Sequence, residues 1–337
     1  MSIKLKNLHV LVVEDLAPIR ELITSVLKAQ GIGTISYATD GQKGYEAFTR
    51  FHPDIVLTDW DMPVINGIEL IKEIRSNPHS PEKTVPIIMM TGYGSPSKIA
   101  QARNIGSTEF LVKPFSALDF SKRVMNIIKN PRDFIITPTF SGPDRRRKLD
   151  IGSSINGTNL RINPTGFTKK IKANNLLQAK VGLGNLSEET LLKSQSIFDN
   201  NTIDFRPIAF KFMEQFKDGL DIVKDKGERN RRAIERLVNP VMQIKANAQI
   251  FKFSLLGDLS SIMLNFLESL NELDSDALDI VEAHHKTLYL IIKDDMRGDG
   301  GYAGQSLETE LDNACKRYMN SRIAMQKEAL QEMIKSK

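Results

Sequence analysis

Cysteine is almost absent from this sequence. Cys315 is the only cysteine among 337 residues, so no disulfide can form within the chain. That composition is typical of a reducing compartment, and we expect a cytoplasmic protein. The segment Met1–Lys6 lacks the apolar core of a signal peptide. No apolar run approaches the roughly 20 residues of a membrane-spanning helix, so we expect a soluble protein.

Nucleotide-binding signatures are also missing. The chain has no Walker-type phosphate loop. Gly298-Asp-Gly-Gly301 lacks the flanking strands of a nucleotide cyclase motif, and we interpret it as a loop. No output domain of a usual kind is recognised, and we predict that the chain is not an enzyme.

The most informative stretch is Asp54-Ile-Val-Leu-Thr-Asp-Trp-Asp-Met-Pro63. Residues 55–58 are mostly β-branched or apolar, which predicts a short strand buried on both faces of a parallel sheet. The strand ends in Asp59, Asp61 follows, and Pro63 prevents further strand pairing. Ligands bind at the carboxyl ends of strands in open α/β sheets, so Asp59 is a candidate functional residue. The simpler alternative is that Asp59 caps the next turn.

Strand and helix patterns alternate along the first 130 residues. The predicted strands are 9–13, 32–37, 55–58, 85–90 and 109–112, and the predicted helices are 19–29, 41–51, 67–76, 97–104 and 118–129. Parallel neighbours need helical crossovers, so this order predicts a doubly wound, five-stranded parallel α/β sheet. One edge of that sheet would carry the polar residues that follow its strands: Glu14, Asp15, Asp59, Thr91 and Lys113.

The charges of these residues suggest a chemistry. Clustered carboxylates repel one another and favour a divalent cation, and oxygen ligands with room for water suit Mg²⁺. An ammonium group and a hydroxyl can hold the oxygens of a phosphoryl group. A carboxylate can act as the nucleophile that accepts this group, because phosphoryl transfer needs mainly positioning and charge stabilisation.

Residues 5 to about 130 resemble the receiver domain of bacterial two-component response regulators, which has a flavodoxin-like fold. The resemblance rests on motifs that occur in order: Glu14-Asp15, Asp59-Trp-Asp-Met-Pro63 with Gly67, which is close to the motif of the chemotaxis regulators, Thr91-Gly92, and Phe110-Leu-Val-Lys113-Pro114-Phe115. It implies a phosphorelay protein that a sensor histidine kinase or a phosphotransfer protein phosphorylates.

The resemblance also implies a role for each matching residue. Asp59 would be the phospho-acceptor, and Lys113 would pair with the phosphoryl group. Thr91 and Phe110 would be the switch residues that respond to it. The metal ligands for Mg²⁺ would be Asp15, Asp59 and the backbone carbonyl of Asp61, with Glu14 acting through water.

Two residues depart from the chemotaxis pattern. Phe110 has no hydroxyl, so a hydrogen bond from a switch tyrosine is absent. Asp61 is acidic where the chemotaxis motif has Asn, and its side chain would face the attacking water. The sequence therefore leaves open whether Asp61 shortens the lifetime of the phosphorylated state.

Positive charge is concentrated in the middle of the chain. Residues 131–185 contain 10 basic and 3 acidic residues, whereas residues 1–130 contain 15 and 13 and residues 186–337 contain 21 and 25. Their content of Gly, Pro, Ser and Asn predicts a linker. The basic run Arg145–Lys148 is interpreted either as part of a solvated, mobile linker or as an electrostatic docking segment for the acidic C-terminal half, nucleic acid or anionic lipid. Without interleaved aromatics, nucleic-acid binding is the weakest of these.

Residues 186–337 show helical periodicity throughout. Ser187 is a predicted helix cap, Asn239-Pro240 a predicted cap followed by proline at the first helical position, and Ser275 another helix start. A break is expected near Gly257. The pattern predicts an antiparallel helical bundle and lacks the strands of a winged-helix DNA reader. We expect an α-helical output domain that acts on a protein target not identified by the sequence.

A pair of histidines in this half offers an alternative function. His284 and His285 lie in mid-helix beside Lys286, as a phosphorylatable histidine of a phosphotransfer domain could. The spacing of Leu278, Val281 and Leu288 instead places His285 on the apolar face and His284 beside it. The main prediction is a response regulator that signals through its helical half, by dimerisation or by altered docking. The alternatives are a phosphorelay intermediate that uses His284 and a DNA-binding regulator.

Overall fold

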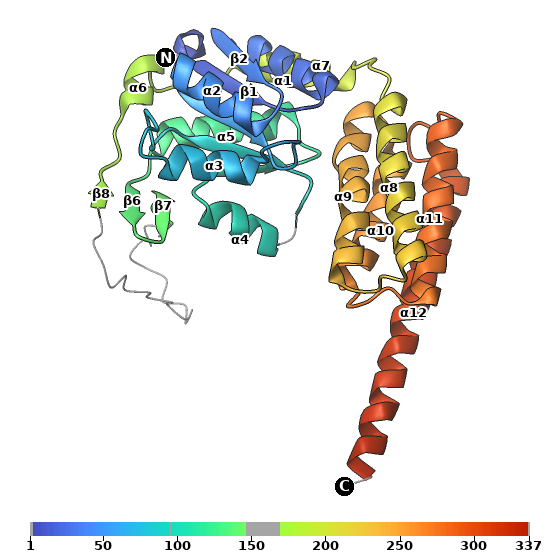
Figure 1. The fold of residues 1–337 in the computed structure, drawn as a ribbon. Coiled ribbons are helices and arrows are strands. Elements are labelled where there is room, and N and C mark those ends of the chain that lie inside the picture. Colours follow the sequence, from blue (N-terminus) through green and yellow to red (C-terminus); the bar gives the residue numbers. More distant parts are fainter. Residues whose placement is uncertain (1–2, 95, 146–168, 336–337) are drawn as a thin grey trace, which may run out of the picture. The chain divides into compact units, whose positions relative to one another are not determined.

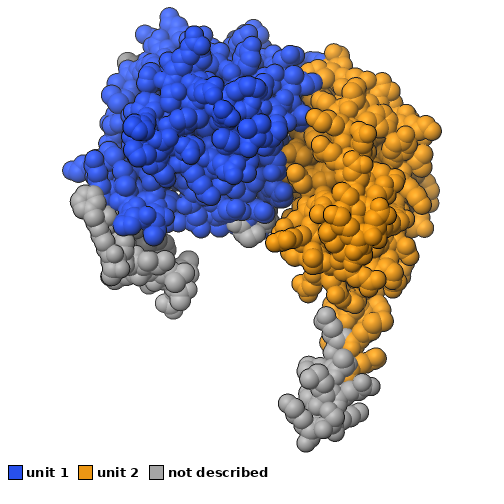
Figure 2. All heavy atoms as spheres, viewed as in Figure 1, with its two compact units in different colours: residues 1–201 blue, residues 202–337 orange. Residues whose placement is uncertain are grey.

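The computed structural model describes residues 3–94, 96–145 and 169–335 (Figure 1). The chain forms two compact units, residues 1–201 and residues 202–337 (Figure 2). Helix α7 (Glu188–Asp199) was expected to belong to the helical half, but it packs within the first unit against two helices of the receiver-like region. The predicted functional ranges 1–130, 131–185 and 186–337 remain a prediction.

The first unit is built on the predicted five-stranded parallel sheet. Its strands are β1 (His9–Val13), β2 (Thr34–Ala38), β3 (Ile55–Asp59), β4 (Ile87–Thr91) and β5 (Glu109–Val112), in the order β2-β1-β3-β4-β5. In this register Val13 pairs with Thr58, and Asp59 pairs with Met90. The carboxyl ends of neighbouring strands therefore meet at one edge, as predicted.

Five helices alternate with these strands. They are α1 (Ala17–Ala29), α2 (Gly41–Phe51), α3 (Gly67–Ser76), α4 (Pro96–Asn104) and α5 (Ala117–Lys129). Asn66 and Ser116 form capping boxes with Glu69 and Asp119, which satisfies amide groups that the first helical turn leaves free. The sequence predicted all five helices to within two residues at each end.

The core lies on both faces of the three central strands. Val10–Val13, Ile55–Leu57 and Ile87–Met90 are completely buried, which explains their continuous apolar runs. Gly67 closes the loop that follows β3, and its amide donates to the carbonyl of Trp60. A Cβ at this position would lie 2.0 Å from the carbonyl oxygen of Asp59, so only glycine lets the loop return this close to the strand end.

A second, small sheet follows the receiver-like region. It contains β6 (Phe134–Thr137), β7 (Phe140–Pro143) and β8 (Lys169–Ile171), paired antiparallel in the order β7-β6-β8. Helix α6 (Leu176–Val181) comes next, and Lys180 pairs with Asp54 at 2.6 Å. These elements differ from the linker expected over residues 131–185. In the basic run, Arg145 is described, and Arg146, Arg147 and Lys148 lie outside the described residues.

Arg75 joins this small sheet to the parallel sheet. It lies in the last turn of α3 with 1% of its surface exposed. Its Nε donates to the carbonyl of Gly106 at 2.9 Å, and its Nη1 donates to the carbonyls of Lys83 at 2.6 Å and Val85 at 2.8 Å. The hydroxyl of Ser141 in β7 donates to the carbonyl of Arg75 at 2.9 Å. The hairpin is therefore fixed to the end of α3.

The described part of the second unit is helical. Its helices are α8 (Arg206–Lys226), α9 (Arg231–Ala248), the short 3-10 helix η2 (Gln249–Phe251), α10 (Ser254–Ser269), α11 (Ser275–Lys293) and α12 (Gly301–Lys335). Helices α8 and α9, α9 and α10, α10 and α11, and α11 and α8 pack as neighbours, which closes a four-helix arrangement to which α12 adds. No helix of the described chain is long and apolar enough to cross a membrane.

Two predicted boundaries in this unit are wrong. Pro240 lies buried inside α9, which begins at Arg231 after its cap Asn230, so Asn239-Pro240 does not start a helix. A proline inside a helix removes one backbone hydrogen bond, and the buried packing of α9 offsets this loss. Gly257 lies inside α10, and the break comes earlier, at η2.

The assignment of the two histidines is reversed. His284 is completely buried and His285 is half-buried. The buried face of α11 contains Ala277, Val281, His284, Leu288 and Ile291, which is rotated by about one residue from the predicted stripe. The ring of His284 donates from Nδ1 to the carbonyl of Ile280 at 3.1 Å. A completely buried imidazole is inaccessible to a phosphoryl donor, so the structure contradicts a phosphotransfer role for His284.

The pKa of His284 predicts acid sensitivity of the second unit. Burial lowers this pKa from 6.5 to about 4. The folded unit keeps the ring neutral. The contribution of His284 to the free energy of unfolding is therefore fully present above pH 6.5 and is lost as the pH drops toward 4, a loss of about 3 kcal/mol. The protection factor against hydrogen exchange of α11 peptides in the full chain, which corrects for the slower intrinsic exchange at low pH, should therefore fall over this range.

A substitution separates this effect from general acid unfolding. His284→Leu should flatten the pH dependence of the protection factor in α11, whereas His79→Gln, which changes an exposed histidine of the first unit, should leave that dependence unchanged. An equally steep dependence in His284→Leu would contradict the assignment.

Candidate functional site

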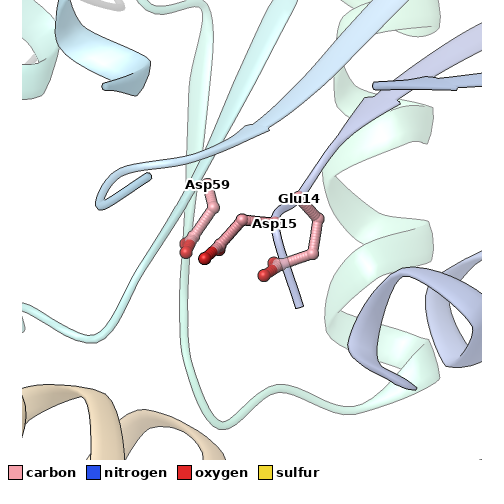
Figure 3. Close-up of side chains that lie close together, drawn as sticks. All are labelled: Glu14, Asp15 and Asp59. Atoms are coloured by element: carbon pink, nitrogen blue, oxygen red, sulfur yellow. The ribbon is translucent and has the colours of Figure 1, made fainter. Parts of the chain in front are cut away.

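Three carboxylates meet at the carboxyl edge of the parallel sheet. Glu14 and Asp15 follow β1, and Asp59 ends β3 (Figure 3). One carboxylate oxygen from each lies within 4.8 Å of the others. Glu14 and Asp59 are buried and Asp15 is half-buried. The sequence predicted this cluster because the three residues follow strands that the topology makes neighbours.

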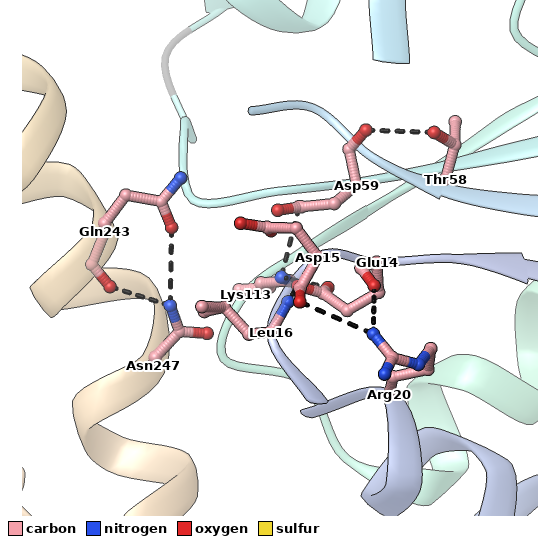
Figure 4. Close-up of polar contacts among 9 residues, drawn as sticks. All are labelled: Glu14, Asp15, Leu16, Arg20, Thr58, Asp59, Lys113, Gln243 and Asn247. Atoms are coloured by element: carbon pink, nitrogen blue, oxygen red, sulfur yellow. Dashed lines mark hydrogen bonds and ion pairs between the residues drawn. The ribbon is translucent and has the colours of Figure 1, made fainter. Parts of the chain in front are cut away.

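Lys113 supplies a cation at the same edge. It follows β5, is 1% exposed, and places its Nζ 2.9 Å from Glu14 Oε2 and 3.1 Å from Asp59 Oδ1 (Figure 4). Burial lowers the pKa of Lys113, but the charges of Asp59 and Glu14 outweigh burial and raise it. Lys113 is therefore held as an ammonium between two carboxylates.

One ammonium does not neutralise the cluster. Burial and the charge of Asp59 raise the pKa of Glu14, and Lys113 offsets this only in part. The guanidinium of Arg20 lies nearby but donates to the backbone carbonyls of Glu14 at 2.7 Å and Asp15 at 3.4 Å, which fixes the loop after β1 (Figure 4). The excess of negative charge and the all-oxygen ligands suit a hard divalent cation.

Asp61 adds a fourth carboxylate to this edge. Its Oδ2 is buried and has no hydrogen-bond partner among the described residues. Burial, followed by the charge of Asp59, raises the pKa of Asp61 to about 7. A buried acceptor without a donor is costly, so this oxygen also fits a site that takes up a cation or a hydrogen-bond donor.

The predicted switch residues lie on neighbouring strands. Thr91 ends β4 and is 1% exposed, and its hydroxyl accepts from the amide of Tyr93 at 3.0 Å. Phe110 is half-buried in β5 and pairs with Met89 of β4. It lies two residues before Val112, the last residue of its strand. The structure therefore brings Thr91 to the acidic edge and places Phe110 farther along the sheet. The guanidinium of Arg123 lies 5.6 Å from the Phe110 ring.

One group beside the site was not found from the sequence. Lys98 of α4 places its Nζ 4.8 Å from the ring centroid of Tyr93 and 5.7 Å from that of Trp60. The two rings meet edge to face at 5.6 Å. Lys98 opposes the rise in the pKa of Asp61. Nothing in the pattern of α4 distinguishes Lys98 from other surface lysines, and only the packing of α4 brings it here.

Comparison with known proteins agrees with this geometry. Residues 10–125 match the family described as response regulator receiver domain. The chain is 30% identical over 124 residues to chemotaxis protein CheY-3 of Vibrio cholerae serotype O1, which covers 37% of this chain and 94% of that protein. The N-terminal domain belongs to the response regulator receiver family. The C-terminal region lies beyond the matched residues and remains unassigned.

Two other similar proteins match the same domain. The probable transcriptional regulator ycf27 of Porphyridium aerugineum is 32% identical over 120 residues, which cover 36% of this chain and 48% of that protein. The solved structure of the chemotaxis response regulator CheY4 of Vibrio cholerae has 31% sequence identity to this chain. The match covers 36% of this chain and 98% of the CheY4 chain, with a TM-score of 0.34.

The acidic cluster predicts that the chain binds a divalent cation. The fluorescence of Trp60, the only tryptophan in the sequence, can be used to measure this binding. Trp60 follows Asp59 and is 6% exposed. Titration of the full chain with Mg²⁺ should change its fluorescence saturably. Asp15→Asn should weaken this binding at least about tenfold, because a direct ligand should matter no less than an outer-shell partner. Glu46→Gln on the exposed face of α2 is the control. Equal affinity in Asp15→Asn and wild type would contradict the site.

Proposed function

We propose that this chain is a phosphorylation-dependent response regulator whose phospho-acceptor is Asp59. A sensor histidine kinase or phosphotransfer protein would be the donor. The main support is the buried Lys113 ammonium held between Glu14 and Asp59, within a domain of the receiver family. The helical C-terminal region would be the output and would act by protein–protein interaction.

In the proposed reaction a carboxylate oxygen of Asp59 attacks the phosphorus of the donor. The phosphorus–nitrogen bond of a phosphohistidine breaks, its electron pair stays on the imidazole, and an acyl phosphate forms on Asp59. Lys113 is within ion-pair distance of Asp59. After the transfer, its ammonium would pair with the negatively charged oxygens of the phosphoryl group. The Thr91 hydroxyl, at the end of the adjacent strand, would donate to another of these oxygens.

Mg²⁺ would be held by Asp15, Asp59 and the backbone carbonyl of Asp61, with Glu14 acting through water. When bound, it supplies positive charge that offsets the carboxylates and the incoming phosphoryl group. The carboxylate cluster supports this role for the cation, since burial and the charge of Asp59 raise the pKa of both Glu14 and Asp61.

Movement of Thr91 and Phe110 would transmit the signal. Both lie on strands that border α4 and α5, so their rearrangement would alter the surface formed by α4, β5 and α5. This surface would act either by forming a homodimer or by changing how it docks on the helical region. A phosphorylated chain with unchanged oligomeric state and unchanged protease sensitivity would argue against both.

Two alternatives receive less support. A phosphorelay intermediate would now have to use His285, whose Nε2 lies 3.3 Å from the carbonyl of Met213 and is therefore already engaged. A DNA-binding regulator would agree with the basic run Arg145–Lys148 and with the name of the Porphyridium relative, a probable transcriptional regulator that matches over the receiver-like part. Residues 202–335 contain helices and no strand, so a winged-helix reader has no support there.

Phosphorylation should be measurable directly by intact-mass spectrometry. Incubation of the full chain with acetyl phosphate and Mg²⁺ should add the mass of one phosphoryl group. Asp59→Asn should abolish the addition, because an amide oxygen is a poor nucleophile and lacks the charge that pairs with Lys113.

The control is His285→Gln, which should be phosphorylated like wild type. Addition that persists in Asp59→Asn and disappears in His285→Gln would move the chemistry to the helical region. No addition to wild type would overturn the proposed function.

Asp61 should shorten the lifetime of the acyl phosphate. Its carboxylate lies at the same edge as Asp59 with an unpartnered oxygen, which can orient or accept a proton from an attacking water. Asp61→Asn should slow the loss of the phosphoryl group several-fold, as followed by the decay of the phosphorylated mass after the donor is removed. Glu82→Gln, far from Asp59 in the loop that precedes β4, is the control. Faster decay in Asp61→Asn would contradict this role.

A further inference from the structure

A cavity with an excess of positive charge lies at the other edge of the receiver domain. It has a volume of about 400 Å³ and is bounded by the end of α3, the loop before β5, and the β6–β7 hairpin. Three of its lining residues are basic: Lys72, Arg75 and Lys83. None of the described residues that line it is acidic. This charge pattern is the opposite of that around Asp59.

Arg75 forms the most buried part of this lining. It has only backbone carbonyls as hydrogen-bond acceptors, and its Nη2 is buried without a partner among the described residues. Glu82 is the acid that acts on its charge, and burial still lowers the pKa of Arg75 to about 9. The Glu82 carboxylate accepts from the amide of Thr84 at 2.8 Å and from its hydroxyl at 2.5 Å. The positive charge therefore has no carboxylate ion pair among the described residues.

More positive charge lies at the rim. The amide oxygen of Asn104, which lines the cavity, accepts from the guanidinium of Arg145. That guanidinium stacks 4.2 Å from the ring centroid of Phe140, another lining residue. Burial lowers the pKa of Arg145, the charge of Arg103 lowers it further, and the charge of Asp144 opposes both effects. Arg145 also begins the basic run noted in the sequence.

We propose that this cavity binds a small phosphate-bearing organic molecule. Lysine and arginine side chains are the usual protein partners of phosphate oxygens. Lys72 and Lys83, for which the described chain shows no ion pair, would hold the phosphate. Ile136 and Phe140 provide an apolar wall for the organic part. The volume is in the range of small-molecule sites, and the basic residues line a cavity rather than the open stripe expected for nucleic acid.

A ligand in this cavity would hold the β6–β7 hairpin against the receiver domain. The hairpin is attached to the receiver through Ser141 and Arg75, and its strand β6 also pairs with β8. A bound anion that bridges Lys72 and Lys83 to the hairpin would tie these segments together. Binding would therefore fix the start of the segment that leads from the receiver toward the C-terminal region.

The test uses ¹⁵N-labelled full chain carrying Asp59→Asn, so that phosphorylation cannot contribute. Amide resonances are followed at constant ionic strength with inorganic phosphate, with AMP and with adenosine as probes. Saturable shifts are expected at Ser76, Asn104, Thr137 and Ser141 with both phosphate and AMP. AMP should bind more tightly because it can also contact the apolar wall, and adenosine should not bind.

Two double variants decide whether the cavity is responsible. Lys72→Gln with Lys83→Gln should weaken binding about tenfold for each charge-assisted hydrogen bond that is removed. Lys43→Gln with Lys122→Gln removes two exposed lysines from α2 and α5 and should leave binding unchanged. Arg75 is left intact because it holds the fold together.

The proposal is overturned if neither phosphate nor AMP shifts these amides. It is equally overturned if both double variants weaken binding alike, which indicates non-specific attraction, or if adenosine binds as well as AMP, which indicates an apolar site. None of these outcomes depends on whether Asp59 accepts a phosphoryl group.

Discussion

The buried contact of Lys113 with Glu14 and Asp59 is the interaction on which the receiver domain depends. Burying an ammonium or a carboxylate alone costs several kcal/mol, and only close pairing offsets that cost. The Nζ of Lys113 provides such pairing for two of the carboxylates, at 2.9 Å from Glu14 and 3.1 Å from Asp59. Asp15 and Asp61 add two further carboxylates to this edge. The carboxylates of the described residues therefore outnumber the ammonium groups at this edge, which suits a divalent cation.

The parallel sheet brings these groups together although they are far apart along the chain. Residues 14, 59 and 113 follow or end strands β1, β3 and β5, and the order β2-β1-β3-β4-β5 places those strand ends along one edge. Completely buried strands fix the register, since a shift by one residue would turn apolar side chains toward the wrong layer. Gly67 then lets the loop after Asp59 return to the strand end. Core packing thus determines how closely the charges approach.

The same reasoning explains what the sequence could and could not predict. The central strands were predictable because burial on both faces produces continuous apolar runs, and the site followed from the residues that end them. Strands β6 to β8 contain three or four residues each in a segment rich in turn-forming residues, so they show no distinct pattern. The helix of His284 was predicted, but its buried face depends on Ala277, a small residue with a weak apolar contribution. Lys98 and Arg75 look like ordinary helix-surface cations until tertiary packing places them.

Arg75 and Lys113 show how the partners of a buried cation determine what its surroundings can bind. Both side chains are 1% exposed. Lys113 lies at the carboxyl edge of the sheet among carboxylates, which outnumber it, so that edge favours a cation. Arg75 binds carbonyls that precede β4 and β5 at the amino edge, and carbonyl dipoles satisfy hydrogen bonds without cancelling its charge. With Lys72 and Lys83 beside it, the amino edge favours an anion. One parallel sheet thus presents two sites of opposite charge preference, and each follows from which groups the fold leaves unneutralised.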